Sequence, residues 1–270
     1  MSSGDWTRRY FVERGELFVP VMESREMVER GKRLAASILS YLRKRGFETP
    51  RILDVGCGTG RVSIPLAYGG AQVVGIDISP LYVSIARRKA EELGLSDRAR
   101  FIVCDARKMS SCVSSYAPFD AIIFVWTTVL GYYDRDTDVE ILREAHKLSH
   151  DSTRLMVLDT ASKDFISFLS NFVGGASWFT DYGEVVVVET PRFNPATGEA
   201  LSTQVFYRKR GRDLIYLGEA KFRVKLYTLD ELVDVARKAG WCLSEAFSRL
   251  STEEPYRTLG AINAVFRKCK

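Results

Sequence analysis

Hydrophobic and polar positions follow two different periodic patterns along the chain, and the first pattern covers residues 51–160. Short runs of β-branched and apolar residues alternate there with stretches of helical periodicity, which is typical of parallel βαβ units. A long amphipathic stretch, Met22–Arg45, precedes them and predicts a helix that ends at Gly46. The apolar runs predict five strands: Arg51–Val55, Gln72–Asp77, Ala99–Cys104, Asp120–Val125 and Arg154–Asp159.

The second pattern covers residues 161–227, where polar and apolar residues alternate with a period of two around the turns "NPATGE" and "KRGRD". This pattern predicts an antiparallel β lobe inserted into an α/β unit made of residues 1–160 and 228–270. After the lobe we expect a helix over Leu229–Ala239 and two strands, Trp241–Ser248 and Gly260–Arg267. Three helix starts carry capping residues: Ser79 before Pro80, Thr137 with Glu140, and Thr228 with Glu231.

Composition narrows the protein class. The chain has 270 residues, 46% of them hydrophobic, and a net charge of +5 without a run of five like charges, so nucleic acid is not a required partner. No apolar stretch reaches the roughly 18 residues of a membrane span. Five cysteines without a CxxC pair predict reduced thiols in a cytoplasmic protein and no zinc-type metal site. Two Gln and three Asn hint at a thermophilic source.

The stretch "LDVGCGTG" joins a predicted buried strand to a helix and places Gly56, Gly58 and Gly60 at alternate positions after Asp54. Glycines at such a turn let backbone N–H groups approach a ligand that a Cβ atom would exclude. The dinucleotide fingerprint needs its third glycine one position later, where this chain has Arg61. The spacing therefore disfavours NAD.

These residues resemble motif I of the class I S-adenosylmethionine-dependent methyltransferases. The resemblance implies a Rossmann-like, seven-stranded, mostly parallel sheet with its last strand antiparallel, helices on both faces, and the cofactor at the carboxyl ends of the strands. It assigns the methionine and ribose part of the cofactor to Asp54, Gly56, Cys57, Gly58 and Gly60.

The same resemblance extends to the ends of the next strands. Asp77 in "VVGIDIS" is suited to accept hydrogen bonds from both ribose hydroxyls, with Ile78 on an adenine face. In "FIVCDARKM", Asp105 would meet the adenine amino group and Ala106 the ring edge. The remaining residues assigned to the cofactor are Val125 and Trp126 at the fourth strand end, and Tyr10, which would close over it.

The loop "TTVLGYY" resembles the Ser/Thr-aromatic-Gly-aromatic loop of methyltransferases that act on small molecules, including amino-sugar N-methyltransferases. The catalytic candidates are Tyr132 and Tyr133 in this loop and His146, one of only two histidines. The inserted lobe is expected to cover an acceptor with an N or O nucleophile, lined by Trp178, Tyr182 and Arg192.

Several alternatives remain at this point. An RNA or protein acceptor is less favoured, because the only basic run, Arg208–Arg212, is also explained as a hairpin turn. A cofactor-binding module without turnover is a third reading. The lobe would either cover the acceptor or join two subunits, so the chain is expected to be a monomer or a homodimer.

Overall fold

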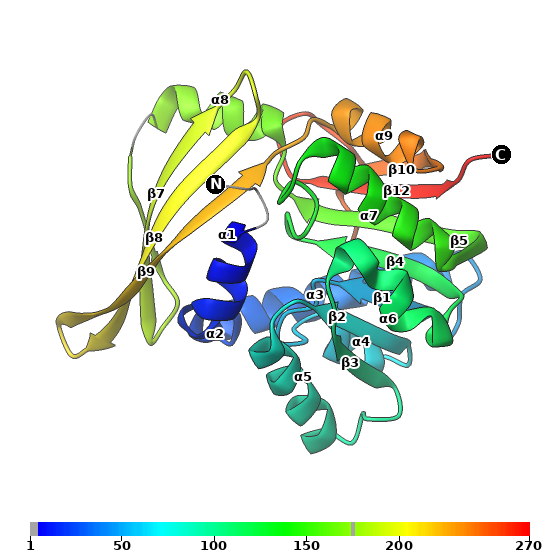
Figure 1. Cartoon of the computed structure of the whole chain (residues 1–270), viewed down its shortest axis with the longest axis horizontal. Helices are drawn as coiled ribbons and strands as arrows, with labels where there is room; N and C mark the ends of the chain where they lie inside the picture. Colours follow the sequence, from blue (N-terminus) through cyan, green and yellow to red (C-terminus); the bar gives the residue numbers. More distant parts are fainter. Residues whose placement is uncertain (1–4, 174–175) are drawn as a thin grey trace.

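The computed structural model describes residues 5–173 and 176–270. Within these residues the chain forms an eight-stranded sheet and a separate four-stranded sheet. Figure 1 shows the two sheets side by side, with the first helices of the chain between them.

The eight-stranded sheet has the strand order β11-β10-β12-β5-β4-β1-β2-β3. Strands β1 to β5 pair in parallel, whereas β12 is antiparallel to both β5 and β10. The predicted fold is therefore confirmed, with a two-residue strand β11 added at the edge. The strands are β1 (Arg51–Val55), β2 (Gln72–Asp77), β3 (Ala99–Val103), β4 (Phe119–Val125), β5 (Ser149–Thr160), β10 (Trp241–Arg249), β11 (Glu254–Pro255) and β12 (Ile262–Lys268).

Helices cover both faces of this sheet, which is why its central strands are nearly continuous apolar runs. On one face α6, α7 and α9 pack into one apolar cluster, and on the other face α3, α4 and α5 pack into a second. The helices are α3 (Arg25–Arg43), α4 (Ser63–Tyr68), α5 (Pro80–Glu92), α6 (Met109–Val113), α7 (Arg135–Lys147) and α9 (Leu229–Lys238).

Local signals were correct at some helix starts and wrong at others. Thr228 and Glu231 form the predicted capping box, but α7 is capped by Asp134, whose carboxylate accepts from the backbone N–H of Thr137, and not by Thr137. The short helix α6 and the single turns η2 (Ala106–Lys108) and η3 (Ser114–Tyr116) were not predicted. The expected helix Met22–Arg45 is shorter, because Ser24 is extended and separates α3 from the preceding helix.

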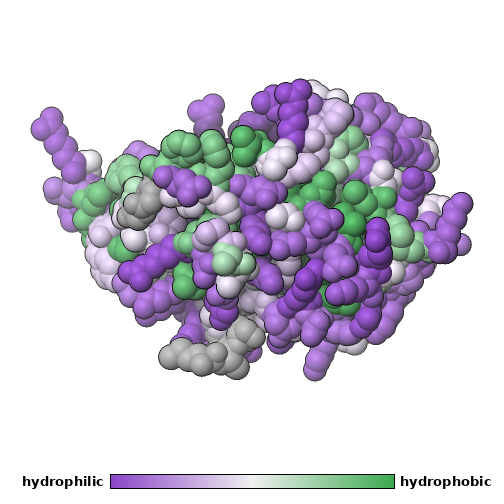
Figure 2. Space-filling model, turned by 90° about the horizontal axis from the view of Figure 1, so that it is seen from above, coloured by the Kyte–Doolittle hydropathy of each residue, from purple (hydrophilic) through white to green (hydrophobic). Residues whose placement is uncertain are grey.

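The inserted lobe is the four-stranded antiparallel sheet β6-β7-β8-β9 preceded by helix α8, which the period-two pattern missed. Both predicted turns join strands, "NPATGE" between β7 and β8 and "KRGRD" between β8 and β9. Figure 2 shows hydrophobic residues among hydrophilic ones on the lobe side, where Phe172 and Phe179 are exposed. The bounds are α8 (Lys163–Val173), β6 (Trp178–Asp181), β7 (Val185–Asn194), β8 (Glu199–Arg210) and β9 (Asp213–Lys225).

A third apolar cluster joins the lobe to the first helices of the chain. These are α1 (Asp5–Arg8), the π-helical turn η1 (Arg9–Glu13) and α2 (Gly15–Met22). Their buried side chains Tyr10 and Leu17 pack against Phe206 and neighbouring residues of the lobe sheet. The lobe is thus anchored by the beginning of the chain. No helix within the described residues is both long and apolar enough to cross a membrane.

Candidate active site

A cavity of about 540 Å³ lies between the carboxyl ends of the parallel strands and the lobe. We call its two sides the floor and the roof. The floor consists of strand-end residues, among them Asp54, Asp77, Asp105 and residues 125–129, 132 and 133. The roof consists of Tyr10, Phe11 and Phe18 from the first helices and Glu189, Gln204 and Phe222 from the lobe.

Asp77 and Asp54 are buried at the ends of neighbouring strands. The carboxylate of Asp77 accepts hydrogen bonds from the backbone N–H groups of Gly58 at 2.9 Å and Ser79 at 2.8 Å. The Ser63 hydroxyl donates to Asp54 at 2.6 Å. Burial raises the pKa of each carboxyl to about 6, against the opposing effect of these hydrogen bonds. Both acids therefore sit where a partner that donates hydrogen bonds would stabilise their charge.

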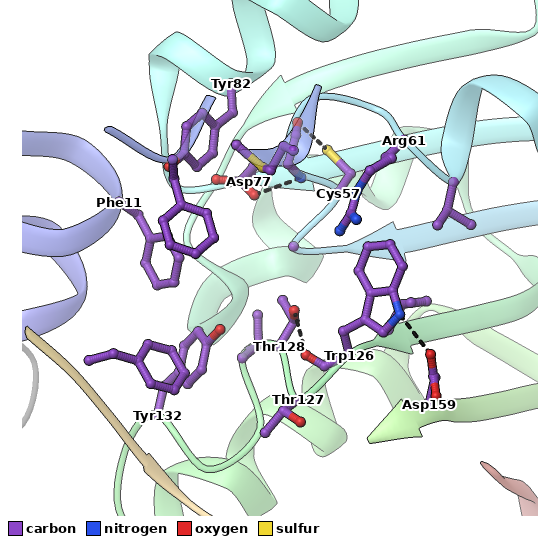
Figure 3. Close-up of a pocket in the computed structure, with 18 of the residues that line it drawn as sticks. Phe11, Cys57, Arg61, Asp77, Tyr82, Trp126, Thr127, Thr128, Tyr132 and Asp159 are labelled. Atoms are coloured by element: carbon purple, nitrogen blue, oxygen red, sulfur yellow. Dashed lines mark hydrogen bonds between the residues drawn. The ribbon is translucent and has the colours of Figure 1, made fainter. Parts of the chain in front are cut away.

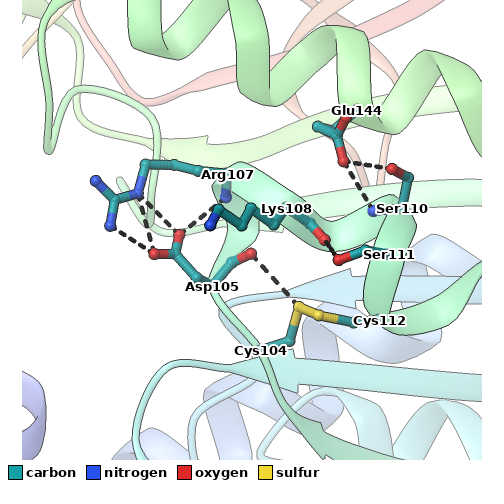
Figure 4. Close-up of a disulfide and its surroundings, with 8 residues drawn as sticks. All are labelled: Cys104, Asp105, Arg107, Lys108, Ser110, Ser111, Cys112 and Glu144. Atoms are coloured by element: carbon teal, nitrogen blue, oxygen red, sulfur yellow. Dashed lines mark hydrogen bonds and ion pairs between the residues drawn. A yellow bond between two sulfur atoms is a disulfide. The ribbon is translucent and has the colours of Figure 1, made fainter.

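Asp105 is held differently, by an ion pair with Arg107 and by a disulfide (Figure 4). Burial raises the pKa of Asp105, but the hydrogen bonds from Arg107 outweigh it and bring the pKa below its ordinary value. Cys104, which precedes Asp105, is bonded to Cys112 on α6. A second disulfide joins Cys242 to Cys269, so the expectation of reduced thiols is wrong for every cysteine except Cys57.

Packing against neighbouring side chains explains part of the conformation of the glycine loop. Gly56 has φ of 78°, and a Cβ atom there would lie 2.2 Å from the methyl group of Thr128. Gly56, Cys57 and Gly58 line the cavity. Gly60 does not line it, because its α-carbon faces Ile64, Ala86 and Phe101 in the core. The structure thus does not place Gly60 at the predicted cofactor contact.

The loop after β4 forms the centre of the floor (Figure 3). Trp126 has φ of 58°, and its indole N–H donates to Asp159 at 2.8 Å. The guanidinium of Arg61 lies over the Trp126 ring at 3.3 Å, and its Nη1 is buried without a hydrogen-bond partner. Burial, with the nearby charge of Arg30, lowers the pKa of Arg61 to about 9. Arg30 itself is paired with Asp159.

Tyr132 and Tyr133 both line the cavity, as expected for the loop "TTVLGYY". The ring of Tyr132 stacks on Phe11 with centroids 5.5 Å apart, and its carbonyl accepts from the Trp6 indole N–H at 3.0 Å. Burial raises the pKa of both tyrosines, so the two hydroxyls stay protonated near neutral pH. Gly131, immediately before them, donates to the buried carboxylate of Asp138 at 2.8 Å.

The lobe also holds the loop after β4 in place, through hydrogen bonds. Gly131 has φ of 86°, and its carbonyl accepts a hydrogen bond of 2.7 Å from the backbone N–H of Lys225, at the end of β9. A Cβ atom at Gly131 would lie 2.1 Å from the carbonyl oxygen of Lys225. The Tyr227 hydroxyl also donates to Asp138 at 2.6 Å. The position of the two tyrosines therefore depends on the lobe as well as on β4.

Most predicted cofactor residues meet at this cavity, namely Tyr10, Asp54, Gly56, Cys57, Gly58, Asp77, Ile78, Asp105, Ala106, Val125 and Trp126. Sequence reasoning missed most of the roof and the cluster of Arg30, Arg61 and Asp159. The charges of these three residues are visible in the sequence. Only the fold, however, brings together the elements that carry them: α3, the glycine loop and β5.

Besides Gly60, four predicted residues do not line the cavity: His146, Trp178, Tyr182 and Arg192. His146 lies near the end of α7, where its ring packs edge-on against Trp241 at 5.4 Å. Trp178 is exposed on the edge strand β6. Arg192 lies on β7, on the sheet face opposite the cavity. Tyr182 packs in the cluster between the lobe and the first helices. The lobe does reach the cavity, but through other side chains.

A family model described as a methyltransferase domain matches residues 48–182, half of the chain. The chain belongs to the methyltransferase domain family. The matched segment contains the floor acids and both tyrosines of the β4 loop, and it ends inside the lobe.

The curated relatives of this methyltransferase domain carry names that refer to different acceptors, such as a release factor glutamine and a tRNA nucleoside. The release factor glutamine methyltransferase of Chlorobaculum tepidum is 36% identical over 118 residues, which are 43% of this chain and 38% of that protein. The chain thus spans well under half of the length of this curated relative.

Two solved structures share the fold over nearly the whole chain. The CcbJ methyltransferase from Streptomyces caelestis has a TM-score of 0.71 at 17% identity and covers 89% of this chain and 90% of its own. CalS10, an amino pentose methyltransferase from Micromonospora echinaspora solved with S-adenosylmethionine, has a TM-score of 0.66 at 17% identity, with 90% and 96% covered. At these identities the likeness shows the fold of the methyltransferase domain and its lobe.

Proposed function

We propose that the chain is an S-adenosylmethionine-dependent methyltransferase that acts on a small molecule with a nitrogen or oxygen nucleophile. The observation that carries this proposal is the cavity of about 540 Å³ at the carboxyl ends of the strands, which joins the buried acids Asp54 and Asp77 to an aromatic roof. Its volume lies within the range of roughly 300–1,000 Å³ that is usual for small-molecule sites. Membership of the methyltransferase domain family supports the activity.

The floor offers a matching partner for each part of the cofactor. Each oxygen of Asp77 accepts one backbone hydrogen bond and keeps a lone pair for a ribose hydroxyl. Ile78 and Ala106 present apolar edges for the adenine ring. Arg61 supplies a buried cation whose Nη1 has no partner, which suits the carboxylate of the methionine part.

When bound, the cofactor supplies a methyl group on a sulfonium sulfur. The residues of this chain then have to orient the acceptor in line with that methyl group and keep water out. Tyr132 and Tyr133 are suited to the first task as hydrogen-bond donors, because their pKa values are raised by burial and they stay protonated. The rings of Phe11 and Phe222 are suited to the second.

A small acceptor is favoured because the roof closes over the floor. The Trp6 indole N–H is bonded to the Tyr132 carbonyl, and the rings of Trp6 and Phe222 are 5.3 Å apart. These contacts join the first helices, the β4 loop and the lobe around the cavity. We therefore propose that residues 161–227 cover the acceptor. A lobe that joins two subunits would be revealed by loss of a dimer, without loss of turnover, when its exposed residues are changed.

The experiment that tests the proposal compares two ligands that differ in the amino-acid part. S-Adenosylhomocysteine carries the carboxylate, and 5′-methylthioadenosine lacks it. We expect Arg61→Met to weaken binding of the first by about tenfold, or about 1.4 kcal/mol, and that of the second by less than twofold. Titration calorimetry measures both, with the exposed Arg143→Met as the matched control. Absence of binding by the unmodified chain would reject the cofactor assignment.

A methylation screen then identifies the acceptor class. Mass spectrometry after incubation with labelled cofactor, applied separately to metabolite, RNA and protein fractions, should find the label in metabolites. Label confined to RNA or protein would instead mean that the roof opens to a macromolecule.

A further inference from the structure

Two polar residues of the roof come from neighbouring strands of the lobe sheet. Glu189 on β7 and Gln204 on β8 are opposite each other in the strand register. They share a sheet face with Val187 and Phe206, which are also register partners and pack against the first helices. Both Glu189 and Gln204 line the cavity. The lobe thus places an acid and an amide side by side, next to the apolar pair Val187 and Phe206.

The two side chains differ in their partners. Gln204 is 9% exposed, and its carbonyl oxygen accepts a hydrogen bond from the Tyr10 hydroxyl. The Glu189 side chain is half-buried, and its carboxylate has no hydrogen bond or ion pair with any described residue. A carboxylate withdrawn from water without a partner is costly, so a cation in the cavity would stabilise this arrangement.

The surroundings of Glu189 also favour a positive charge. The rings of Tyr10, Phe18 and Phe222 line the same roof, and aromatic ring faces attract cations. The cationic side chains that line the cavity are elsewhere engaged: Arg30 is paired with Asp159 and Arg61 is stacked on Trp126.

We propose that Glu189 is a specificity-determining residue that selects a positively charged acceptor, an aliphatic amine, by binding its ammonium group beneath the lobe. Gln204, fixed by Tyr10, presents an amide beside the carboxylate and is suited to orient it. This inference rests on the proposed methyltransferase function, because it takes the roof as the acceptor side of the cavity. It leaves open which acceptor atom receives the methyl group.

The test uses matched pairs of small probes with the same carbon skeleton: benzylamine and benzyl alcohol, 2-phenylethylamine and 2-phenylethanol, cyclohexylamine and cyclohexanol. Their binding to the full chain loaded with S-adenosylhomocysteine is measured by titration calorimetry at neutral pH. We expect the amine to bind at least about tenfold more tightly than its alcohol in at least one pair. Equal binding in all three pairs overturns the proposal, and this arm needs no variant.

The second arm locates the preference. Glu189→Gln should reduce the amine preference to less than about threefold and leave the affinity for S-adenosylhomocysteine within about threefold. Glu219→Gln is the matched control, since Glu219 is exposed on the lobe sheet and does not line the cavity. Circular dichroism checks that each variant is folded, and Glu189→Asp should keep part of the preference.

The outcomes separate the two proposals. An equal loss of amine and S-adenosylhomocysteine binding in Glu189→Gln would assign Glu189 to the amino group of the cofactor and overturn the acceptor role. An amine preference that survives in Glu189→Gln also overturns it. If the unmodified chain does not bind S-adenosylhomocysteine at all, the proposed function fails, and the probe titrations on the unliganded chain still decide whether Glu189 binds cations.

Discussion

The floor of the cavity comes from strands that are neighbours in one sheet, whereas the roof joins residues as far apart as Tyr10 and Gln204, 194 positions along the chain. The floor carries the buried acids, which are held by groups close in sequence, as Asp77 is by the Ser79 backbone N–H and Asp54 by the Ser63 hydroxyl. The roof is mostly aromatic and is held by packing between separate segments. The difference teaches that the floor is locally encoded, while the roof depends on tertiary assembly.

Reduction of the two disulfides should have the largest effect on the free energy of unfolding. Every cysteine lies in the α/β part, so this effect should come from that part and not from the lobe. The chain-entropy relation gives about 3.6 kcal/mol for Cys242–Cys269 and about 2.5 kcal/mol for Cys104–Cys112, from sequence separations of 27 and 8 residues. Denaturant unfolding with and without a phosphine reductant measures the loss. A variant with Ser at all four positions is the control and should not respond to the reductant.

Removal of the Asp77 carboxylate tests the floor. Asp77→Ala should weaken S-adenosylmethionine binding by one to two powers of ten, because hydrogen bonds from a ligand to a charged group are worth about 1.5–3 kcal/mol. Calorimetry compares it with Asp151→Ala, a change at an exposed position. Unchanged affinity would show that the cofactor does not bind at Asp77.

Cofactor affinity should rise with pH between about 5 and 7. Burial holds the pKa of Asp77 near 6 in the unliganded chain, and hydroxyl donors bind the ionised form more strongly. At pH 5 about one tenth of a group with this pKa is ionised, so affinity should be up to about tenfold lower than at pH 7.5. Asp77→Asn should remove most of this dependence, and a dependence that persists in it would point to Asp54 instead.

The stability of the unliganded chain should respond to the same group in the opposite sense. Because the native pKa lies above that of an unfolded Asp, the native state binds more protons between about pH 4 and 6. The Asp77 contribution to the free energy of unfolding therefore falls as pH rises through this window. The difference in unfolding free energy between the unmodified chain and Asp77→Asn, measured at pH 4 and pH 7, isolates it.

The smallest effect is expected at the roof. Tyr10→Phe removes the hydroxyl that donates to Gln204 and should lower the free energy of unfolding by about 1 kcal/mol, since a buried amide loses its partner. Binding of S-adenosylhomocysteine should change by less than twofold. Tyr207→Phe, on a partly exposed lobe residue, is the control. A large loss of cofactor binding in Tyr10→Phe would mean that floor and roof act as one unit.

The floor could be predicted because its signals are local. A strand pattern followed by Asp54 or Asp77 fixes where a carboxylate lies in a parallel sheet, and the glycine spacing identifies the loop between them. The glycine spacing does not reveal which of the glycines line the cavity: a Cβ atom at Gly60 would meet core side chains, and Gly60 is not among the lining residues.

The roof could not be predicted from periodicity. A period-two pattern tells which lobe residues share a face, but not which face meets the first helices, so Arg192 was assigned to the cavity although it lies on the opposite face from Glu189. Trp178 shares the face of Glu189, its register partner, but it lies on the edge strand β6 and does not reach the cavity. The disulfides were missed because cysteine spacing does not reveal distance in space. Cytoplasmic location, thermophilic origin and oligomeric state stay predictions.

The anchoring of the lobe on residues 6–22 has a consequence for how the chain folds. During synthesis these residues leave the ribosome early, while their partners Phe206 and Phe222 follow about 200 residues later. Until then Tyr10 and Leu17 lack the native surface that buries them. Contacts of such high sequence separation slow folding, so the roof should close last. Folding intermediates should therefore already have a formed floor and bind a hydrophobic dye through the unpaired first helices.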